Sequence, residues 1–169
     1  NIEDNIIILF KDISAIIRSV DSKLELRGRD SLGISIQVQV EKSNNLRKRK
    51  SYSVLNDRNS KTEVLTNYNK GIFQFTFKTF NKIGALGENT NKIKKMIKFD
   101  KLFNETVKEN IVNSALIVSH TRWASVGEVS IENTHPITLK NNYNKSTNWI
   151  SSILNGDIYN YREFLYKNR

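Results

Sequence analysis

Hydrophobic positions in the first part of the chain change from a helical spacing to a strand spacing. Between positions 6 and 24 they recur at steps of three and four, which predicts a helix with one buried face. From Ile34 to Val40 every second residue is apolar and the residues between are polar, which predicts a half-buried strand. Phe73, Phe75 and Phe77 alternate with polar residues in the same way and predict a second strand.

The rest of the chain alternates between irregular and regular patterns. Residues 42–68 are polar, rich in asparagine and without periodicity, so we expect a long polar and basic loop or insertion there. We expect a helical region over about 89–110, a short buried strand at 115–118, a strand at 149–154 and a helix that begins near Asn160. This order predicts a mixed α+β protein with an antiparallel sheet.

Composition excludes some classes of protein. The length of 169 residues is that of one domain, and we expect a single domain over 1–169. No run is long and apolar enough to cross a bilayer, and the start lacks a signal-peptide pattern, so we expect no membrane partner and a cytoplasmic location. The absence of cysteine excludes disulfides and thiolate metal sites. The two histidines have no clustered carboxylates beside them, so no metal site is expected.

The formal net charge of +10 raises the question of a nucleic-acid partner. Basic residues concentrate at 47–50 and over 92–101. Neither cluster is interleaved with the aromatic residues on which bases stack. We interpret the first as a solvated loop and the second as the wet face of an amphipathic helix, and we do not expect nucleic acid to be the partner. The alternative is a basic nucleic-acid or scaffold module built around residues 42–68, which would show salt-dependent binding.

Two segments, 119–128 and 154–164, contain the candidate chemistry. Arg122 follows a predicted strand, and a guanidinium can bind a carboxylate through two hydrogen bonds. Asn155 and Gly156 also follow a strand, and an amide side chain beside a glycine backbone N–H can stabilise an oxyanion. Each feature has a simpler explanation. Asn-Gly is typical of a hairpin turn, and a lone arginine or histidine is more often structural.

In their order along the chain, these segments resemble motifs of the class II glutamine amidotransferases, and most closely those of the glucosamine-6-phosphate synthases. The similarity covers residues 6–40 and 80–166. The matching residues are Leu24 to Gly33, Lys82 to Gly84, His120 to Ala124, Gly127 and Glu128, Asn133, His135 and Pro136, and Asn155 and Gly156.

The resemblance implies an N-terminal-nucleophile hydrolase fold, a four-layer αββα sandwich with antiparallel sheets. It implies hydrolysis of the glutamine side-chain amide to glutamate and ammonia. An acceptor domain of the sugar-phosphate isomerase type would then transfer the ammonia to fructose 6-phosphate, giving glucosamine 6-phosphate. The implied partner is L-glutamine, and no metal or organic cofactor is implied. The oligomeric state stays open, a homo-oligomer included.

The resemblance also implies a role for individual residues. Arg122 would bind the α-carboxylate of glutamine, with Trp123 beside it and the Ser125 hydroxyl assisting. Residues 122–130 would form a loop that closes over glutamine. Asn155 and Gly156 would form the oxyanion hole. The supporting residues would be Arg27 and Asp30, as an ion pair, together with His135.

The sequence departs from the family pattern in several places. Val126 stands where the synthases have histidine, and residues 155–161 are more similar to an asparagine synthetase. The nucleophile of the family, an N-terminal cysteine, is absent from the chain. An acidic residue that binds the substrate amino group would lie beyond Arg169. We therefore expect a domain that is incomplete at both ends. The alternative is a naturally cysteine-free domain that senses glutamine without cleaving it.

Overall fold

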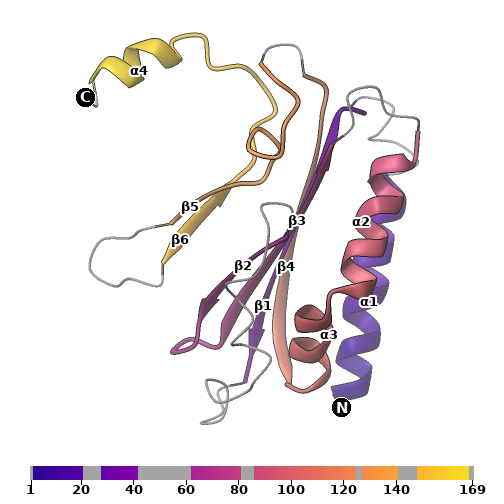
Figure 1. The fold of residues 1–169 in the computed structure, drawn as a ribbon. Coiled ribbons are helices and arrows are strands. Elements are labelled where there is room, and N and C mark those ends of the chain that lie inside the picture. The colour runs from indigo at the N-terminus through magenta and orange to yellow at the C-terminus, as the bar shows by residue number, and fades with distance from the viewer. Residues whose placement is uncertain are drawn as a thin grey trace.

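The computed structural model describes residues 2–20, 28–41, 62–80, 86–124, 127–140 and 148–167. The described chain is mixed α+β with two antiparallel sheets, as expected for the general class (Figure 1). The helices are α1 (Ile2–Ser19), α2 (Glu88–Phe99), α3 (Lys101–Lys108) and α4 (Tyr161–Lys167). The strands are β1 (Ser31–Val40), β2 (Thr62–Asn67), β3 (Ile72–Phe80), β4 (Val112–Arg122), β5 (Ile137–Lys140) and β6 (Trp149–Ser152). Arg27, Ser125, Val126, residues 42–61 and residues 82–84 lie outside the described residues.

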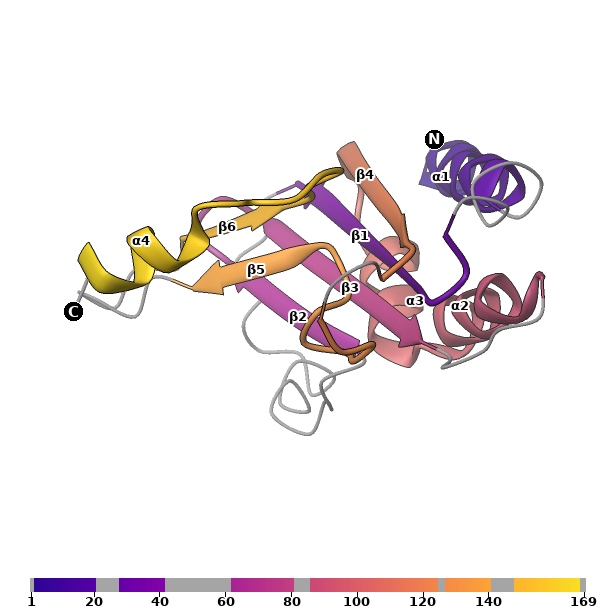
Figure 2. The same cartoon turned by 90° about the horizontal axis from the view of Figure 1, so that it is seen from above.

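The main sheet has the strand order β2-β3-β1-β4, and α1, α2 and α3 cover one of its faces (Figures 1 and 2). The alternating apolar residues of β1 and β3 point toward these helices and form the core with them. Phe103 of α3 lies at its centre, with its ring edge-to-face against those of Phe10, Phe75 and Phe77. The periodic residues of the sequence therefore define this layer.

The helical region expected over about 89–110 is two helices separated at Asp100. This residue ends α2 in an extended conformation, and its carboxylate accepts a hydrogen bond of 2.8 Å from the backbone N–H of Phe103. An aspartate that caps the next helix supplies a partner for one of the first backbone N–H groups, so a new helix begins there. No helix in the described ranges is long and apolar enough to cross a membrane.

The opposite face of the main sheet is covered by a second sheet, formed by β5 and β6 (Figure 2). The prediction that β1 is half-buried is therefore wrong for its first half, where Ser35 is only 5% exposed. On β3, Gln74 and Thr76 are buried on the same face. Polar side chains can be buried in this layer because they form hydrogen bonds with one another. The alternating pattern in the sequence is the same whether the polar residues face another sheet or face water.

The strand boundaries also differ from the expectations. The polar stretch expected as a loop to residue 68 includes the edge strand β2. Val64 and Leu65 are adjacent and not alternating, so the strand has no period-2 signal, and pairing with β3 holds it in place. Strand β4 is longer than the 115–118 expected because it pairs along the whole length of β1. Strand β5, at Ile137–Lys140, was not predicted.

Candidate functional site

The end of β4, where Arg122 lies, is held by residues that precede β1. The backbone N–H of Asp30 donates to the carbonyl of Arg122 at 3.1 Å, and the Asp30 carboxylate accepts from the backbone N–H of Ala124 at 2.7 Å. A Cβ atom at Gly28 would lie 3.0 Å from backbone atoms of Thr121 and Arg122, so the close approach needs glycine. These contacts are what a supporting role for Asp30 requires, whereas its expected partner Arg27 lies outside the described residues.

The guanidinium of Arg122 lies beneath the loop that follows it. Its Nη1 donates to the backbone carbonyl of Glu128 at 3.2 Å, and the side chain of Asn133 donates to the same carbonyl at 3.0 Å. Gly127 has a φ of 85°, a left-handed conformation that glycine adopts without strain. The chain thereby turns back over Arg122. Trp123 points outward and is 67% exposed.

Two histidines meet over a glycine of β1. In the register of the main sheet, Gly33 lies between Lys78 of β3 and His120 of β4. A Cβ atom on Gly33 would collide with the backbone carbonyl oxygen of His135, so His135 rests directly on β1. The His120 and His135 rings lie 4.8 Å apart between centroids, at an interplanar angle of 54°. His120 is two residues from Arg122 and on the same face of β4.

The segment after β6 reaches this histidine pair. The backbone N–H of Leu154 donates to Nδ1 of His135 at 3.3 Å. Asn155 and Gly156 follow directly, and both are exposed. The chain continues from them into α4 and not into a strand, so Asn155-Gly156 is not the turn of a hairpin. Contacts therefore run from β4, through His120 and His135, to the residue before the expected oxyanion pair.

Positive charge surrounds the two histidines. Burial lowers the pKa of His120 below its usual value, and the nearby Arg122 lowers it further. Burial also lowers the pKa of His135, followed by the charges of His120, Arg122 and Lys78. The Leu154 backbone acts in the opposite direction on both, but burial outweighs it. The lowered pKa values favour the neutral form of both rings at pH 7, and the positive charge of the site is then that of Arg122 and Lys78. Burial lowers the pKa of Lys78 as well, and the carboxylates of Glu63 and Glu132 act against this.

This charge suits an anion better than a cation. The described part of the chain contains no group of three His, Cys, Asp or Glu side chains that could hold a metal ion. A carboxylate, in contrast, would be attracted by the guanidinium of Arg122 and could accept two of its hydrogen bonds. The site can therefore bind an acid such as the α-carboxylate of an amino acid.

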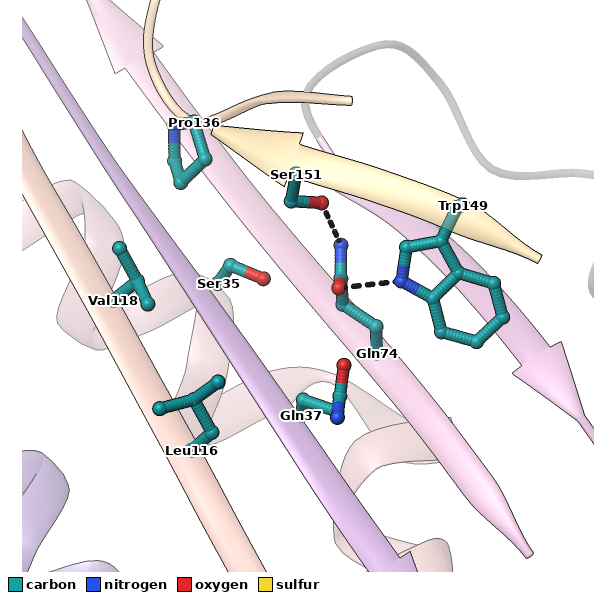
Figure 3. Close-up of a pocket in the computed structure, with 8 residues that line it drawn as sticks. All are labelled: Ser35, Gln37, Gln74, Leu116, Val118, Pro136, Trp149 and Ser151. Atoms are coloured by element: carbon teal, nitrogen blue, oxygen red, sulfur yellow. Dashed lines mark hydrogen bonds between the residues drawn. The ribbon is translucent and has the colours of Figure 1, made fainter. Parts of the chain in front are cut away.

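A cavity of about 130 Å³, lined by both polar and apolar side chains, lies between the two sheets (Figure 3). Gln74 lies at one side, where its Nε2 donates to the Ser151 hydroxyl at 2.7 Å and its Oε1 accepts from Nε1 of Trp149 at 2.7 Å. The remaining lining residues are Ser35, Gln37, Leu116, Val118 and Pro136. Sequence reasoning missed Gln74, because one glutamine in an alternating strand gives no signal of its partners.

Comparison with known proteins found no similar family, protein or structure: no protein-family model matches the chain, and no match was found among curated proteins or solved structures.

Proposed function

We propose that the chain forms the glutamine-binding part of a glutamine amidotransferase domain of class II. The observation that carries the proposal is the position of Arg122. It ends a strand, lies beneath the carbonyl of Glu128, and is joined through His120 and His135 to the segment that leads into Asn155. In this proposal, Arg122 as the anchor for a carboxylate and Asn155-Gly156 as the oxyanion segment are linked by one continuous set of contacts.

In this proposal Arg122 binds the α-carboxylate of L-glutamine. On binding, the loop over residues 122–130 closes over glutamine and excludes water, which strengthens the contact. The side-chain amide of Asn155 and the backbone N–H of Gly156 donate to the oxygen of the glutamine amide as negative charge develops there. Cleavage also needs a nucleophile, and the 169 residues contain no cysteine to supply one.

The fold we propose is the four-layer αββα sandwich of the N-terminal-nucleophile hydrolases. What supports it is the order of layers, with helices α1 to α3, the main sheet and then the β5–β6 sheet (Figure 1). The proposed complete enzyme passes ammonia to fructose 6-phosphate in an acceptor domain. An asparagine-synthetase-like acceptor is the alternative that residues 155–161 favour.

Isothermal titration calorimetry of the full chain with L-glutamine tests the proposal. We expect binding of L-glutamine, and we expect Arg122→Ala to weaken it by about 10- to 150-fold, because a hydrogen-bonded charge partner is lost. Arg18→Ala is the matched control, since Arg18 is exposed on α1, on the far side of the main sheet. It should leave the affinity unchanged.

Two results would contradict the proposal. One is the absence of heat with L-glutamine while the chain is folded by circular dichroism. The other is equal weakening by Arg122→Ala and Arg18→Ala, which would indicate nonspecific attraction by positive charge. Butanamide, which lacks the α-amino and α-carboxylate groups but keeps the side-chain amide, should bind much more weakly than L-glutamine.

A second candidate is a glutamine sensor, which the absence of cysteine from the sequence favours. A sensor and an amidotransferase differ at the start of the mature protein. N-terminal sequencing of the natural protein that contains these residues distinguishes them. An N-terminal cysteine supports the amidotransferase, and a mature protein that begins with another residue supports the sensor.

A further inference from the structure

The segment that follows β6 is held to the rest of the molecule at a histidine. Residues 153–158 are exposed along their length, and among them Leu154 donates its backbone N–H to Nδ1 of His135. An imidazole nitrogen accepts a hydrogen bond only while it has no proton. The contact therefore exists only in the neutral, Nε2-protonated form of the His135 ring.

His135 is itself fixed in place by its surroundings. Its carbonyl oxygen lies against Gly33 of β1, where no Cβ atom fits. The preceding residue, Thr134, is fully buried, and its hydroxyl donates to the carbonyl of Ser130 at 2.7 Å. The following residue, Pro136, is also buried. A ring held in this way can position the exposed segment to which it is bonded.

Among the described residues, the charged or titratable groups that act on His135 are basic. Lys78 faces it from β3, and His120 and Arg122 face it from β4, while β1 contributes only Gly33 at this point. The Glu132 carboxylate is fully exposed on the same loop and acts on Lys78. A proton added to His135 would therefore enter a half-buried group of cations and would remove the acceptor for the Leu154 N–H. The Leu154 backbone itself acts to raise the pKa of both rings, but burial and the neighbouring positive charges lower it by more.

We propose that His135 is a positioning residue, whose neutral ring holds Leu154, and with it Asn155 and Gly156, against the end of β4, and that protonation of the His120–His135 pair releases this segment. The hydrogen bond and its release are independent of any ligand. The consequence for glutamine rests on the proposed function, because a released Asn155 is no longer directed at the site that Arg122 anchors.

The direction of the pH effect follows from linkage. Since the pKa of each histidine is lower in the folded chain than the usual 6.5, the unfolded chain binds more protons in the interval between the two values. The stability that the folded chain has while both histidines are neutral is fully present above about pH 6.5. It is lost as the pH falls through that interval. Release of the segment occurs in the same interval.

Hydrogen exchange of the Leu154 amide, measured by NMR on the full chain, tests the proposal. Rates are expressed relative to the unstructured peptide at each pH. At pH 7.5 we expect protection of Leu154 that falls by about two- to tenfold as the pH decreases below the pKa of His135, the factor that corresponds to one hydrogen bond. The ¹⁵N shifts of the same ring should show an unprotonated Nδ1 at pH 7.5.

Two variants separate the role of the acceptor from that of the ring. His135→Asn keeps a nearby oxygen acceptor that cannot be protonated, and it should protect Leu154 at every pH. His135→Leu has no acceptor and should leave Leu154 unprotected at every pH. His120→Phe keeps an aromatic ring beside His135 but removes a charge that lowers its pKa, so release should shift to higher pH without disappearing.

Other outcomes would overturn the proposal. It is wrong if Leu154 is equally protected in the wild type and in folded His135→Leu, or if the ring of His135 carries its proton on Nδ1 at pH 7.5. It is also wrong if protonation leaves Leu154 protected, since its carbonyl would then be holding the charged ring.

The glutamine measurement is separate. If the wild type binds L-glutamine, His135→Leu should weaken binding by the same two- to tenfold as the ordered population falls. If the wild type does not bind, the proposed function fails while the exchange result still decides the role of His135.

Discussion

The two faces of the main sheet are buried in different ways. The face toward α1, α2 and α3 is lined by Ile, Val and Phe side chains, several of them fully buried. The face toward β5 and β6 is lined mostly by serine, threonine, glutamine, lysine and histidine side chains, such as Ser35, Gln74, Thr76 and Lys78, with the apolar Leu116 and Val118 of β4 among them. The first face gains free energy from the burial of apolar area, and the second depends on hydrogen bonds between specific partners.

This difference separates stability from function. An apolar layer tolerates changes that keep its volume, and it offers few groups that could recognise a ligand. A polar layer binds its neighbours through directed hydrogen bonds, so it holds the loop after β4 and the segment after β6 in a defined position. The candidate site lies at the end of this polar layer, where Arg122, His120 and His135 meet.

The largest expected effect is on the helix-facing layer. Phe103→Ala removes a fully buried ring that contacts three other aromatic rings, and it should lower the free energy of unfolding by about 3–5 kcal/mol. Phe99→Ala is the same substitution at a ring that is 74% exposed, and it should change stability by less than about 0.5 kcal/mol. Urea unfolding followed by circular dichroism measures both. Equal losses would mean that α2 and α3 do not pack as described.

A smaller effect is expected where the polar face meets the loop. Gly33→Ala places a methyl group against the carbonyl of His135, and overpacking of this kind costs about 1–3 kcal/mol. The loop must then move, so the His135 and Leu154 resonances should shift in an NMR spectrum. Ser35→Ala, two residues along the same face of β1, is the control. If Gly33→Ala moves these resonances no more than the control does, His135 does not rest on β1.

The hydrogen bonds between the two sheets come next. Gln74→Leu keeps a similar volume but removes the partner of Trp149 Nε1 and one of the two partners of the Ser151 hydroxyl, which also bonds to Thr138, at a cost of about 1–2 kcal/mol. Gln37→Leu changes the neighbouring glutamine, which pairs with Gln74 in the register and lines the same cavity. We expect a smaller loss there. Urea unfolding gives both values, and Trp149 fluorescence in a Trp123→Phe background should change only with Gln74→Leu.

The same difference explains how much of the molecule could be predicted from the sequence. The residues that face the helices repeat with the period of their own element, so local spacing predicts α1, β1 and β3. The contacts of the polar face join distant residues, such as Gln74 with Trp149, and no local pattern encodes them. Strand β2 was not predicted because its apolar residues Val64 and Leu65 are adjacent. The polar residues of β1 were expected to face solvent because an alternating pattern does not show whether another layer covers them.

Some of the residues around the candidate site could also be picked out from the sequence. Gly28, Asp30 and Gly33 stood out in one motif, and the structure gives the glycines and the aspartate local reasons, namely close approach to β4, support of Ala124 and contact with His135. The contact between His120 and His135 was not predicted, because each was considered alone. The roles of Trp123, Arg122, Asn155 and Gly156 in glutamine binding stay predictions.

The smallest expected effect concerns an ion pair that joins the second sheet to the edge of the main one. Nζ of Lys140 on β5 lies 2.6 Å from the carboxylate of Glu63 on β2, with the two side chains 50% and 29% exposed. Because both remain partly in water, Glu63→Gln should cost no more than about 1 kcal/mol, and less at high salt. Glu88→Gln breaks the 3.1 Å pair with Lys92 within α2, which is more exposed, and should cost about 0.5 kcal/mol or less. Urea unfolding at low and high salt compares them. A larger, salt-independent loss in Glu63→Gln would mean that this pair, and not Gln74, holds the second sheet in place.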